Sequence, residues 1–378
     1  MQSMSNEILT HFENVTDPRI NRGNNHPLLE LVFMALTSHL CGCNDWASIA
    51  RFVDDKKSWF AKHLEMPFGV PSDDTFRRVF ARLDTAQFLV AMHQWVDAFA
   101  GSLRGQGVAI DGKVLRGSFD KASSQSPLHT ITAFATATRI CLRQATVDGK
   151  SNEIPAVPEM LKLLDLNGAI VSLDAMHCQT ATAAAIVDAK ADYILAAKNN
   201  QPKLFEFLHD LFEQALEDGS KVKTYRYVEC DKGHGRNERR EYITLKAPVC
   251  PELVKWVNLK SITMTYRTSK EKRSGKEREN VMFYISSCAP KVKSLAQHIR
   301  GHWAIENSLH HVLDVTFTED SSRIRKGSGP EVAACLRRMA ANILQLDTTI
   351  NDNIRGKRMR LGWSEEKLDQ LYAGFLSN

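Results

Sequence analysis

Hydrophobic residues in the first hundred positions recur at helical spacing. Residues 27–41 are apolar on nearly every side, which predicts a buried helix, and a second helix is expected over 46–64. The segment PSDDT at 71–75 predicts a helix start, because its serine or first aspartate can accept hydrogen bonds from free backbone N–H groups. A third helix is therefore expected over 75–83.

Two short helices, a turn and an arginine-bearing helix are the elements of a helix-turn-helix module that binds DNA. The third helix carries Arg77, Arg78 and Arg82. However, residues 1–100 hold 9 Lys and Arg against 12 Asp and Glu, and the same geometry is common in plain helical bundles. DNA binding by this part and a purely structural role both stay open.

From residue 101 the pattern changes to apolar strands that alternate with helices. The sequence Val108-Ala109-Ile110-Asp111 predicts a short strand that ends in an acid, and 169–174 repeats this arrangement up to Asp174. Further strands are expected at 129–140, 141–147 and 192–196, with helices at 155–166 and 179–189. Three strands followed by helix–strand–helix–strand describe an α/β layer with a mixed sheet.

A different pattern follows a predicted helix at 201–216. Strand-like alternation recurs at 223–229, 239–245, 261–266 and 281–286, separated by polar, basic segments. Helix resumes at 292 and is clearest at 303–313 and 331–346. We therefore expect four parts: a helical N-terminal domain (1–100), an α/β core (101–200 and 292–346), a mostly β insertion (201–291) and a basic helical tail (347–378).

The composition is that of an ordinary globular protein, with 43% hydrophobic residues. No apolar run approaches the roughly 20 residues that a membrane span needs, and the N-terminal region lacks a secretory signal, so we expect a cytoplasmic location and no membrane partner. Among the 8 cysteines only Cys41 and Cys43 lie close together, which is a poor zinc signature. We expect all of them to be reduced and most of them to be packing residues.

Positive charge is concentrated after residue 100. Residues 101–378 carry 40 Lys and Arg against 32 Asp and Glu, and 323–360 alone carries nine against three. This basic segment includes Arg337, Arg338 and the run Arg355 to Arg360. Such residues can contact nucleic-acid phosphates without reading the base sequence, although a solvated helical face explains part of the pattern.

Three carboxylates are candidates for chemistry. Asp111 and Asp174 each follow an apolar strand, where a carboxylate is costly unless it is paired or binds a cation. A helix cap or a turn is the structural alternative. Glu306 lies on a polar helical stripe with His302 and His310, at spacings of four residues. That stripe is also compatible with an exposed face or with zinc, but one helix rarely supplies a complete zinc site.

Several motifs in fixed order give the chain a family resemblance. They are AIDGK (109–113), KSNEI (150–154), LDAMHCQ (173–179), ADYILAAKNNQ (191–201), HGRNERR (234–240), IRGHWAIENSLHHVLDVTFTED (299–320) and SSRIR (321–325). With these motifs the chain resembles the insertion-sequence transposases of the H-repeat-associated, ISAs-type family, which are DDE transposases. The resemblance extends over nearly the whole chain.

The resemblance implies a ribonuclease-H-like core, a mixed five-stranded sheet flanked by helices. It implies that Asp111, Asp174 and Glu306 form a catalytic triad that binds two Mg²⁺ ions, with Mn²⁺ as a substitute. It also implies metal-dependent cleavage and strand transfer at the ends of an insertion sequence. The expected partners are DNA, as terminal inverted repeats and target, and a second copy of the chain on the paired ends.

One departure limits what the resemblance carries. Related transposases have the pattern Y-x2-R-x3-E-x6-K around the glutamate, and this chain has Ile299, His302 and Leu313 in place of the other three residues. The roles of those residues therefore do not transfer.

Six basic residues are candidate DNA contacts, with solvated loop or helix positions as the alternative. They are Lys113, Lys198, Arg236, Arg239, Arg323 and Arg325. Two other functions fit the same residues: a ribonuclease-H-like nuclease without joining activity, and a catalytically silent transposase relic that only binds DNA. The β insertion and the helical N-terminal part favour the transposase, because bringing two ends together needs additional DNA contacts.

Overall fold

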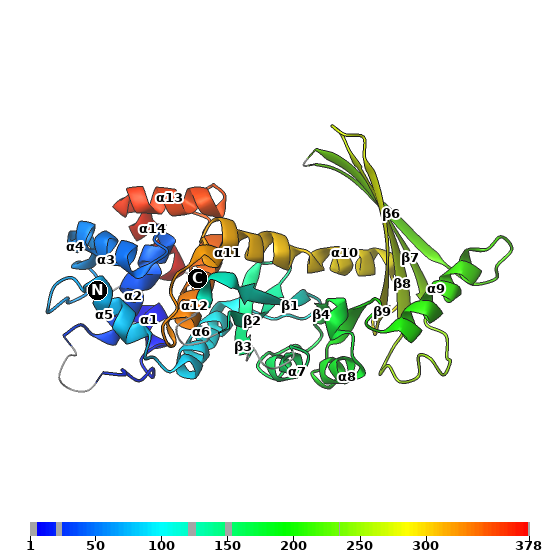
Figure 1. Cartoon of the computed structure of the whole chain (residues 1–378), viewed down its shortest axis with the longest axis horizontal. Coiled ribbons are helices and arrows are strands. Elements are labelled where there is room, and N and C mark those ends of the chain that lie inside the picture. Colours follow the sequence, from blue (N-terminus) through cyan, green and yellow to red (C-terminus); the bar gives the residue numbers. More distant parts are fainter. Residues whose placement is uncertain (1–5, 20–24, 120–125, 148–152, 234, 377–378) are drawn as a thin grey trace.

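The computed structural model of the chain describes residues 6–19, 25–119, 126–147, 153–233 and 235–376. Its elements form an elongated molecule, with a helical part at one end, a sheet with covering helices in the middle and long strands at the other end (Figure 1). Among these residues no helix is long and apolar enough to cross a membrane. All eight cysteines are free, as expected.

The described residues of the N-terminal part form six helices, three of which begin within two residues of the predicted starts, at Leu28, Trp46 and Asp73. They are α1 (Asn6–Thr10), α2 (Leu28–Leu40), α3 (Trp46–Asp55), α4 (Lys57–Phe60), α5 (Asp73–Phe80) and α6 (Thr85–Ala100). Helix α3 begins with a capping box between Asp45 and Ser48, and the side chain of Ser72 caps α5 by accepting a hydrogen bond from the Thr75 N–H. The aspartate of α5, Asp74, pairs with Arg77 and Arg78, so these two arginines have partners within their own helix.

The sheet is mixed and has nine strands, in the order β3-β2-β1-β4-β5-β9-β8-β7-β6. The first five are β1 (Gly107–Leu115), β2 (Leu128–Ala135), β3 (Ile140–Val147), β4 (Ile170–Leu173) and β5 (Asp192–Ala197). Strand β1 is antiparallel to β2 and parallel to β4, and β4 is parallel to β5. The prediction of an α/β layer with a mixed sheet is confirmed.

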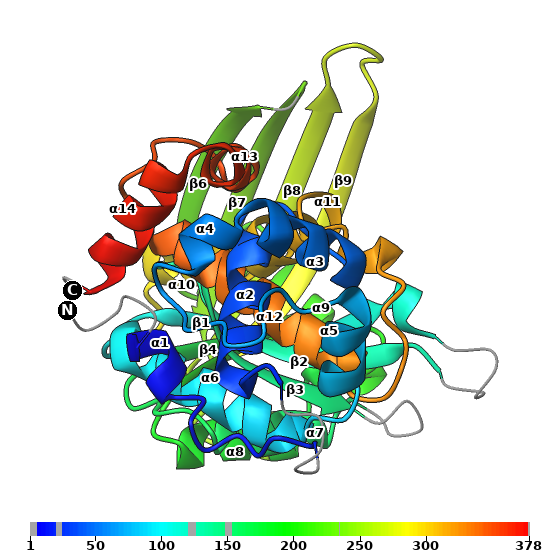
Figure 2. The same ribbon diagram turned by 90° about the vertical axis from the view of Figure 1, so that its left-hand side faces the viewer.

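The prediction of a five-stranded sheet is wrong, because the insertion does not form a separate sheet. Its strands are β6 (Tyr225–Gly233), β7 (Arg236–Lys246), β8 (Ser261–Glu271) and β9 (Glu277–Ser286). Strand β9 is antiparallel to β5, so all four extend the same sheet. We call the outer parts of these strands, residues 226–241 and 265–282, the arm; Figure 2 shows it projecting beyond the helices.

Helices cover both faces of the sheet. Helix α10 (Val292–His302) packs Leu295, Ala296 and Ile299 against Ile194 and Tyr284 of one face. The other face is covered by α7 (Ala156–Leu161), α8 (Thr180–Asp188) and α9 (Pro202–Leu216), and Figure 1 shows α7 and α8 on the side opposite α10. The sheet is therefore the middle layer of three.

The C-terminal helices connect the sheet to the N-terminal helices. Helix α12 (Gly329–Leu346) is buried along most of its length, between β3 and α2. Helices α13 (Ile354–Trp363) and α14 (Glu365–Leu376) then return to the N-terminal part, where the hydroxyls of Tyr372 and Thr37 are 2.7 Å apart. The indole N–H of Trp59 also donates to Asp369 at 2.7 Å. The tail and the first hundred residues therefore pack as neighbours.

Four residues predicted as basic surface are buried, and that part of the prediction is wrong. Arg337, Arg338, Lys357 and Arg358 are 1%, 0%, 8% and 3% exposed. Arg338 donates to the carboxylate of Glu319 at 2.9 Å, while Arg358 donates to the His39 carbonyl at 2.9 Å. These cations satisfy backbone carbonyls and a buried carboxylate where the helical part meets the core, so they stabilise the fold instead of facing a partner.

Substitution of Glu319 by Gln should be strongly destabilising. It leaves the guanidinium of Arg338 buried without a counter-charge, and breaking a buried pair in this way costs roughly 3–5 kcal/mol of unfolding free energy. Glu365, which is 40% exposed and pairs with Lys56, provides the control, because Glu365→Gln should cost no more than about 1 kcal/mol. Urea denaturation of both variants measures the difference, and equal losses would contradict the assignment.

Candidate active site

Asp111 and Asp174 lie side by side on adjacent parallel strands. Ile110 is in register with Leu173, so the next residue on each strand is the acid. Strand β4 ends there, as predicted for Asp174. Strand β1 instead continues to Leu115 through its pairing with β2, so the expectation that Asp111 ends its strand is wrong. The two carboxylates are neighbours because β4 stops, which exposes the edge of β1 at Asp111.

Each aspartate is held by the backbone that follows it. The Oδ1 atom of Asp111 accepts the Gly112 N–H at 2.9 Å, and Oδ1 of Asp174 accepts the Ala175 N–H at 2.6 Å. Asp174 thereby caps a short 3₁₀ helix, η2 (Ala175–His177). The helix cap that the sequence offered as an alternative is therefore present, and it is compatible with a chemical role for the same carboxylate. Its side chain is 50% exposed, whereas that of Asp111 is 22% exposed.

Glu306 lies in a π-helical segment, η3 (Ile305–His310), between α10 and α11 (His311–Val315). Wider π turns wind less per residue than α turns, which keeps His302, Glu306 and His310 on the side that faces the sheet. Nδ1 of His302 lies 3.0 Å from the Ser172 hydroxyl on β4, and Nδ1 of His310 lies 3.5 Å from Oδ2 of Asp111 on β1. The helix therefore contacts both strands that carry the aspartates.

The three carboxylates line one cavity of about 230 Å³. Its lining also includes the polar residues Ser172, Lys198 and His302 and an apolar wall of Leu173, Ile194, Ala196, Met282, Tyr284, Ile299 and Trp303. Lys198, which directly follows β5, places its Nζ 3.3 Å from Oδ1 of Asp174. The cavity is thus acidic and oxygen-rich on one side and apolar on the other.

Charge repulsion and burial raise two of the acidic pKa values. Burial, together with the charges of Glu306, Asp174 and Glu153, raises the pKa of Asp111 to about 7, although the Gly112 N–H opposes this. Burial and the charge of Asp174 likewise raise the pKa of Glu306. For Asp174, burial acts upward, but the Ala175 N–H and Lys198 outweigh it and lower the pKa. Three carboxylates around one cavity favour a bound cation.

The donor set fits hard divalent cations. Carboxylate oxygens are the ligands that Mg²⁺ takes in proteins. Within the described ranges, the carboxyl oxygens of Asp111, Asp174 and Glu306 do not all lie within 4.8 Å of one another. Each of the three side chains can still supply an oxygen ligand to a divalent cation in this cavity.

The histidines do not add positive charge. Burial lowers the pKa of His302 to about 4, and burial with the charges of Arg338 and Lys113 lowers that of His310 to about 3. Both rings are therefore neutral at pH 7. His302 contacts Ser172 and His310 contacts Asp111, so the one-helix zinc site considered from the sequence does not form.

Family models match most of the chain. Residues 102–343 match the model described as "Transposase DDE domain", and residues 9–96 match "DDE_Tnp_1-associated". This chain belongs to the DDE transposase family. The family that its motifs indicated is thus confirmed.

Relatives of this transposase share its length. It is 34% identical over 372 residues to "Putative transposase YncI" of Escherichia coli O157:H7, covering 97% of this chain and 94% of that protein. It is 30% identical over 374 residues to "H repeat-associated putative transposase YhhI" of Escherichia coli strain K12, covering 97% and 98%. A solved piggyBac transposase synaptic complex with hairpin DNA overlaps 95% of this chain and 76% of that one, at 12% identity and TM-score 0.46, which is too distant to bear on function.

The six basic residues predicted to contact DNA lie in different places. Lys198 is at the cavity and is 49% exposed. Lys113 is only 7% exposed and pairs with Asp314 at 2.5 Å and Asp320 at 3.4 Å, which indicates a structural role. Arg325 donates to the Gly117 carbonyl at 3.0 Å and stacks on Phe119. The remaining three, Arg323, Arg236 and Arg239, are exposed, the last two on the arm.

Sequence reasoning missed Glu153 and underrated His310. Glu153 raises the pKa of Asp111, and its carboxylate occupies the space that a side chain at position 112 would fill, 2.5 Å from the Cβ position. The close atom is the far end of a flexible side chain, so this contact alone does not require glycine at position 112. Glu153 belongs to the KSNEI motif (150–154), which carried the family resemblance but did not by its spacing indicate a position beside Asp111; Lys150 and Asn152 of the motif lie outside the described residues.

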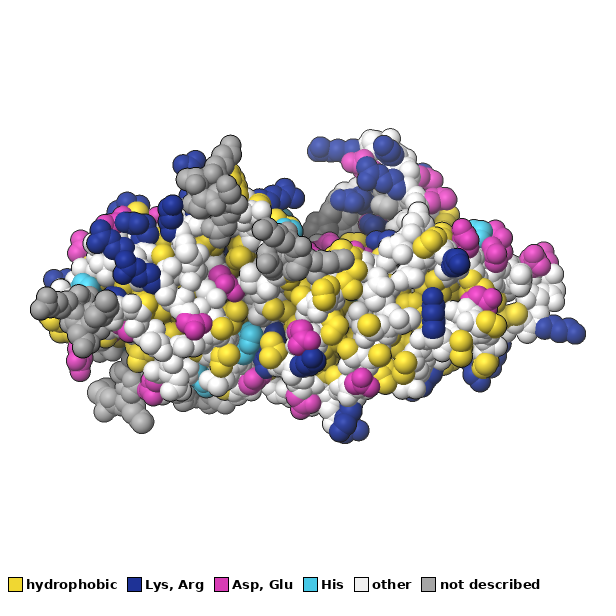
Figure 3. Space-filling view, turned by 60° about the horizontal axis from the view of Figure 1, so that its bottom comes forward, with side chains coloured by type: hydrophobic (Ala, Val, Ile, Leu, Met, Phe, Trp, Pro, Cys, Tyr) yellow, Lys and Arg dark blue, Asp and Glu magenta, His cyan; other side chains and the backbone are white. Residues whose placement is uncertain are grey.

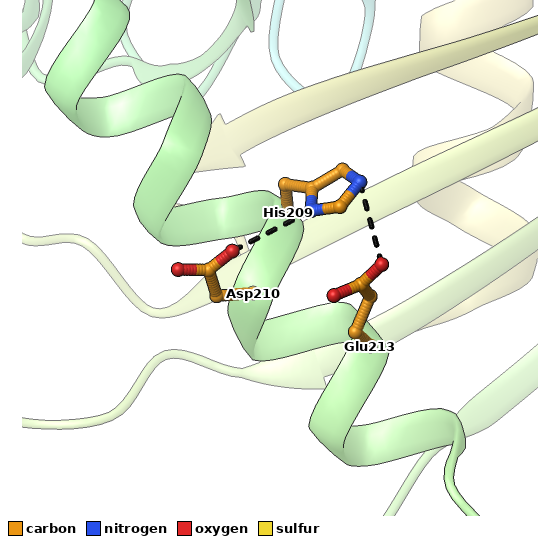
Figure 4. A group of neighbouring side chains, drawn as sticks. All are labelled: His209, Asp210 and Glu213. Atoms are coloured by element: carbon orange, nitrogen blue, oxygen red, sulfur yellow. Dashed lines mark ion pairs between the residues drawn. The ribbon is translucent and has the colours of Figure 1, made fainter.

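A second acidic group lies away from the cavity. His209, Asp210 and Glu213 of α9 hold their ligand atoms within 4.8 Å of one another, with His209 3.5 Å from Asp210 and 3.6 Å from Glu213 (Figure 4). All three are exposed and come from one helix. They are ordinary helix-surface pairs, which contribute only tenths of a kcal/mol.

The raised pKa of Asp111 predicts a stabilising substitution. In the unfolded chain this carboxyl titrates near 3.8, and in the folded chain near 7, so folding loses stability as pH rises from about 4 to 7. Asp111→Asn should therefore be more stable than wild type at pH 8 without divalent cations, by on the order of 2 kcal/mol. The gain should vanish at pH 4.

Chemical denaturation with EDTA at the two pH values measures this effect. Asp174→Asn is the matched control, because the pKa of Asp174 is lowered in the folded chain and its loss should reduce stability at pH 8. Stabilisation of both variants, or of neither, would contradict the different environments assigned to the two aspartates.

Proposed function

We propose that this chain is a catalytically active transposase that cleaves DNA at the ends of an insertion sequence and joins the freed 3′ ends to target DNA. The observation that carries the proposal is the meeting of Asp111, Asp174 and Glu306 at one cavity, from two adjacent strands and a π-helical segment. The matching family model supports DNA as the substrate.

In this proposal Asp111, Asp174 and Glu306 would together hold the divalent cations, Mg²⁺ or Mn²⁺, through their carboxylate oxygens. When bound, such ions activate the attacking oxygen and neutralise charge on the leaving oxygen. The Gly112 and Ala175 N–H groups keep the two aspartates oriented. His310, beside Oδ2 of Asp111, limits the rotation of that carboxylate.

The other cavity residues position the DNA. Lys198 has its ammonium group at the edge of the cavity, where it can contact an oxygen of the reacting phosphate. Trp303 is 44% exposed and lies on the apolar wall with Tyr284, so the two rings can pack against the adjacent sugar and base. The same wall excludes water from one side of the cavity.

The finer architecture follows from this chemistry. We propose that strands β3-β2-β1-β4-β5, with α10 to α12, form the ribonuclease-H-like core, and that the parts 1–100, 201–291 and 347–378 serve it as DNA-binding or supporting domains. Two copies are expected on the paired element ends, because the ends must be joined together. The proposed substrate of this chain is cellular DNA, so we propose that the chain acts in the cytoplasm.

Cleavage of DNA that carries the native flanks of the gene tests the proposal. Wild type with Mg²⁺ or Mn²⁺ should cut at the element boundaries and join the ends to target DNA. Asp111→Asn should lower the rate roughly a thousandfold or more, because the ions contribute several kcal/mol to the transition state. Glu213→Gln, in the exposed α9 group, should cut like wild type.

Three outcomes separate the alternatives. Cutting without joining would favour the nuclease, and binding without cutting by folded protein would favour the relic. Equal activity of wild type and Asp111→Asn would remove Asp111 from the chemistry.

A further inference from the structure

The arm has two faces that the alternation of strand side chains defines. On β9, Phe283 packs against Phe205 and Phe212 of α9, whereas Met282 and Tyr284 line the catalytic cavity. Side chains two residues apart lie on the same face, so Asn280 and Arg278 continue the cavity side outward. We call the face that carries Tyr284, Met282, Asn280 and Arg278 the cavity face of the arm, and the opposite face of the arm the outer face.

The register extends the cavity face across all four strands, since directly opposed residues share a face. Arg278 opposes Ser269, which opposes Glu238. Asn280 opposes Arg267, which opposes Arg240. Helix α10 lies on this side, because its Arg300 reaches Glu229 at 3.2 Å and Asp231 at 2.7 Å.

Four arginines therefore share the cavity face: Arg236, Arg240, Arg267 and Arg278. Arg240 and Arg267 are directly opposed, and the carboxylate of Glu238 accepts hydrogen bonds from both, which holds them together despite their like charge. Arg236 and Arg278 are exposed, and among the described residues neither forms an ion pair at contact distance, although Arg236 is directly opposed to Glu271 and its charge lowers the pKa of Glu238. The positive charge of these two is therefore available to a partner.

The outer face has fewer unpaired cations. Arg239 pairs with Glu241 at 2.9 Å, and Lys270 pairs with Glu277 at 2.6 Å. Arg236 and Arg239, both predicted as DNA contacts, thus lie on opposite faces. Residues 229–240 and 267–280 together hold ten Lys and Arg against six Asp and Glu. Figure 3 shows Lys and Arg side chains gathered on the projecting arm, at the upper right.

The size of the cavity limits how DNA approaches. At about 230 Å³ it is smaller than a typical pocket for a drug-sized ligand, so it holds little more than the reacting phosphate and its sugar. The flanking duplex must lie on the surfaces that adjoin the cavity. The cavity face begins at Tyr284, inside the cavity, and reaches Arg278 six residues later, a distance of roughly 20 Å or about six base pairs of DNA.

We infer that the cavity face of the arm binds the sugar–phosphate backbone of duplex DNA adjacent to the cleaved bond, with Arg236 and Arg278 as direct phosphate contacts. This inference rests on the proposed function and specifies the path of the DNA. Arg240 and Arg267, fixed by Glu238, extend the same track toward the cavity. The outer face does not contact this DNA.

The test compares two double variants that each remove two positive charges from the arm, one variant on each face. Arg236→Gln with Arg278→Gln changes the cavity face, and Lys232→Gln with Arg239→Gln changes the outer face. Binding of a duplex that carries one element end and its native flank is measured at several salt concentrations, in EDTA.

Loss of two phosphate contacts should reduce the slope of log K against log salt concentration by about 2 and raise Kd roughly tenfold or more. The outer-face variant should bind within about twofold of wild type. Equal thermal melting of the three proteins establishes that they are folded, which is expected because all four substituted residues are exposed.

Equal weakening by both double variants, or wild-type binding by the cavity-face variant, would overturn the inference. A parallel cleavage assay with wild type and Asp111→Asn separates it from the proposed function. If the cavity-face variant loses affinity but wild type does not cut DNA, the proposed function is contradicted and the inferred DNA-binding face is supported. If wild type cuts DNA and the cavity-face variant keeps the affinity of wild type, DNA binding by the cavity face is contradicted and the proposed function is supported.

Discussion

Repulsion between carboxylates is the constraint on which the site depends. Parallel pairing of β1 with β4 places Asp111 and Asp174 on adjacent strands, and the π-helical segment adds Glu306 to the same cavity. Without a cation, the burial of Asp111 and its repulsion by the other acids cost folding free energy, which the raised pKa of Asp111 reflects. The surrounding structure must therefore hold the acids in place. Two backbone N–H groups and the helix above the strands do so.

Buried charges further along β1 serve that purpose. Lys113, two residues after Asp111 and on the same face of the strand, is neutralised by Asp314 and Asp320 from the segment that follows Glu306. Arg338 of α12 binds Glu319 of that same segment. One chain of ion pairs thus joins the strand of the first acid, the helix of the third and the long helix that anchors the N-terminal part. The stability of the helical unit and the geometry of the site are coupled.

Hydrophobic periodicity placed α2, α3, α5 and the core strands, because their buried faces leave a regular pattern in the sequence, but it did not predict α1 or α6. It located Asp174 and the helix of Glu306 correctly. It ended β1 too early, since the strand continues past Asp111 through a hairpin with β2 that carries polar residues. It shortened the strands of the arm for the same reason: both faces are solvated there, so no apolar alternation marks them.

Arginines that bind buried carbonyls, such as Arg358, cannot be distinguished by composition from arginines that face solvent. Glu153 escaped notice because its position beside Asp111 depends on the fold.

The continuity of the sheet has a consequence for how such enzymes diversify. Because β9 pairs with β5, the arm belongs to the same hydrogen-bonded framework as the strands of the two aspartates, with no hinge between them. Its hairpins can gain or lose residue pairs at their tips while every register closer to the cavity is preserved. Insertions and deletions at these tips would alter the length of the arm without moving the carboxylates that line the cavity. The arm is thus a part that evolution can lengthen or shorten independently of the chemistry.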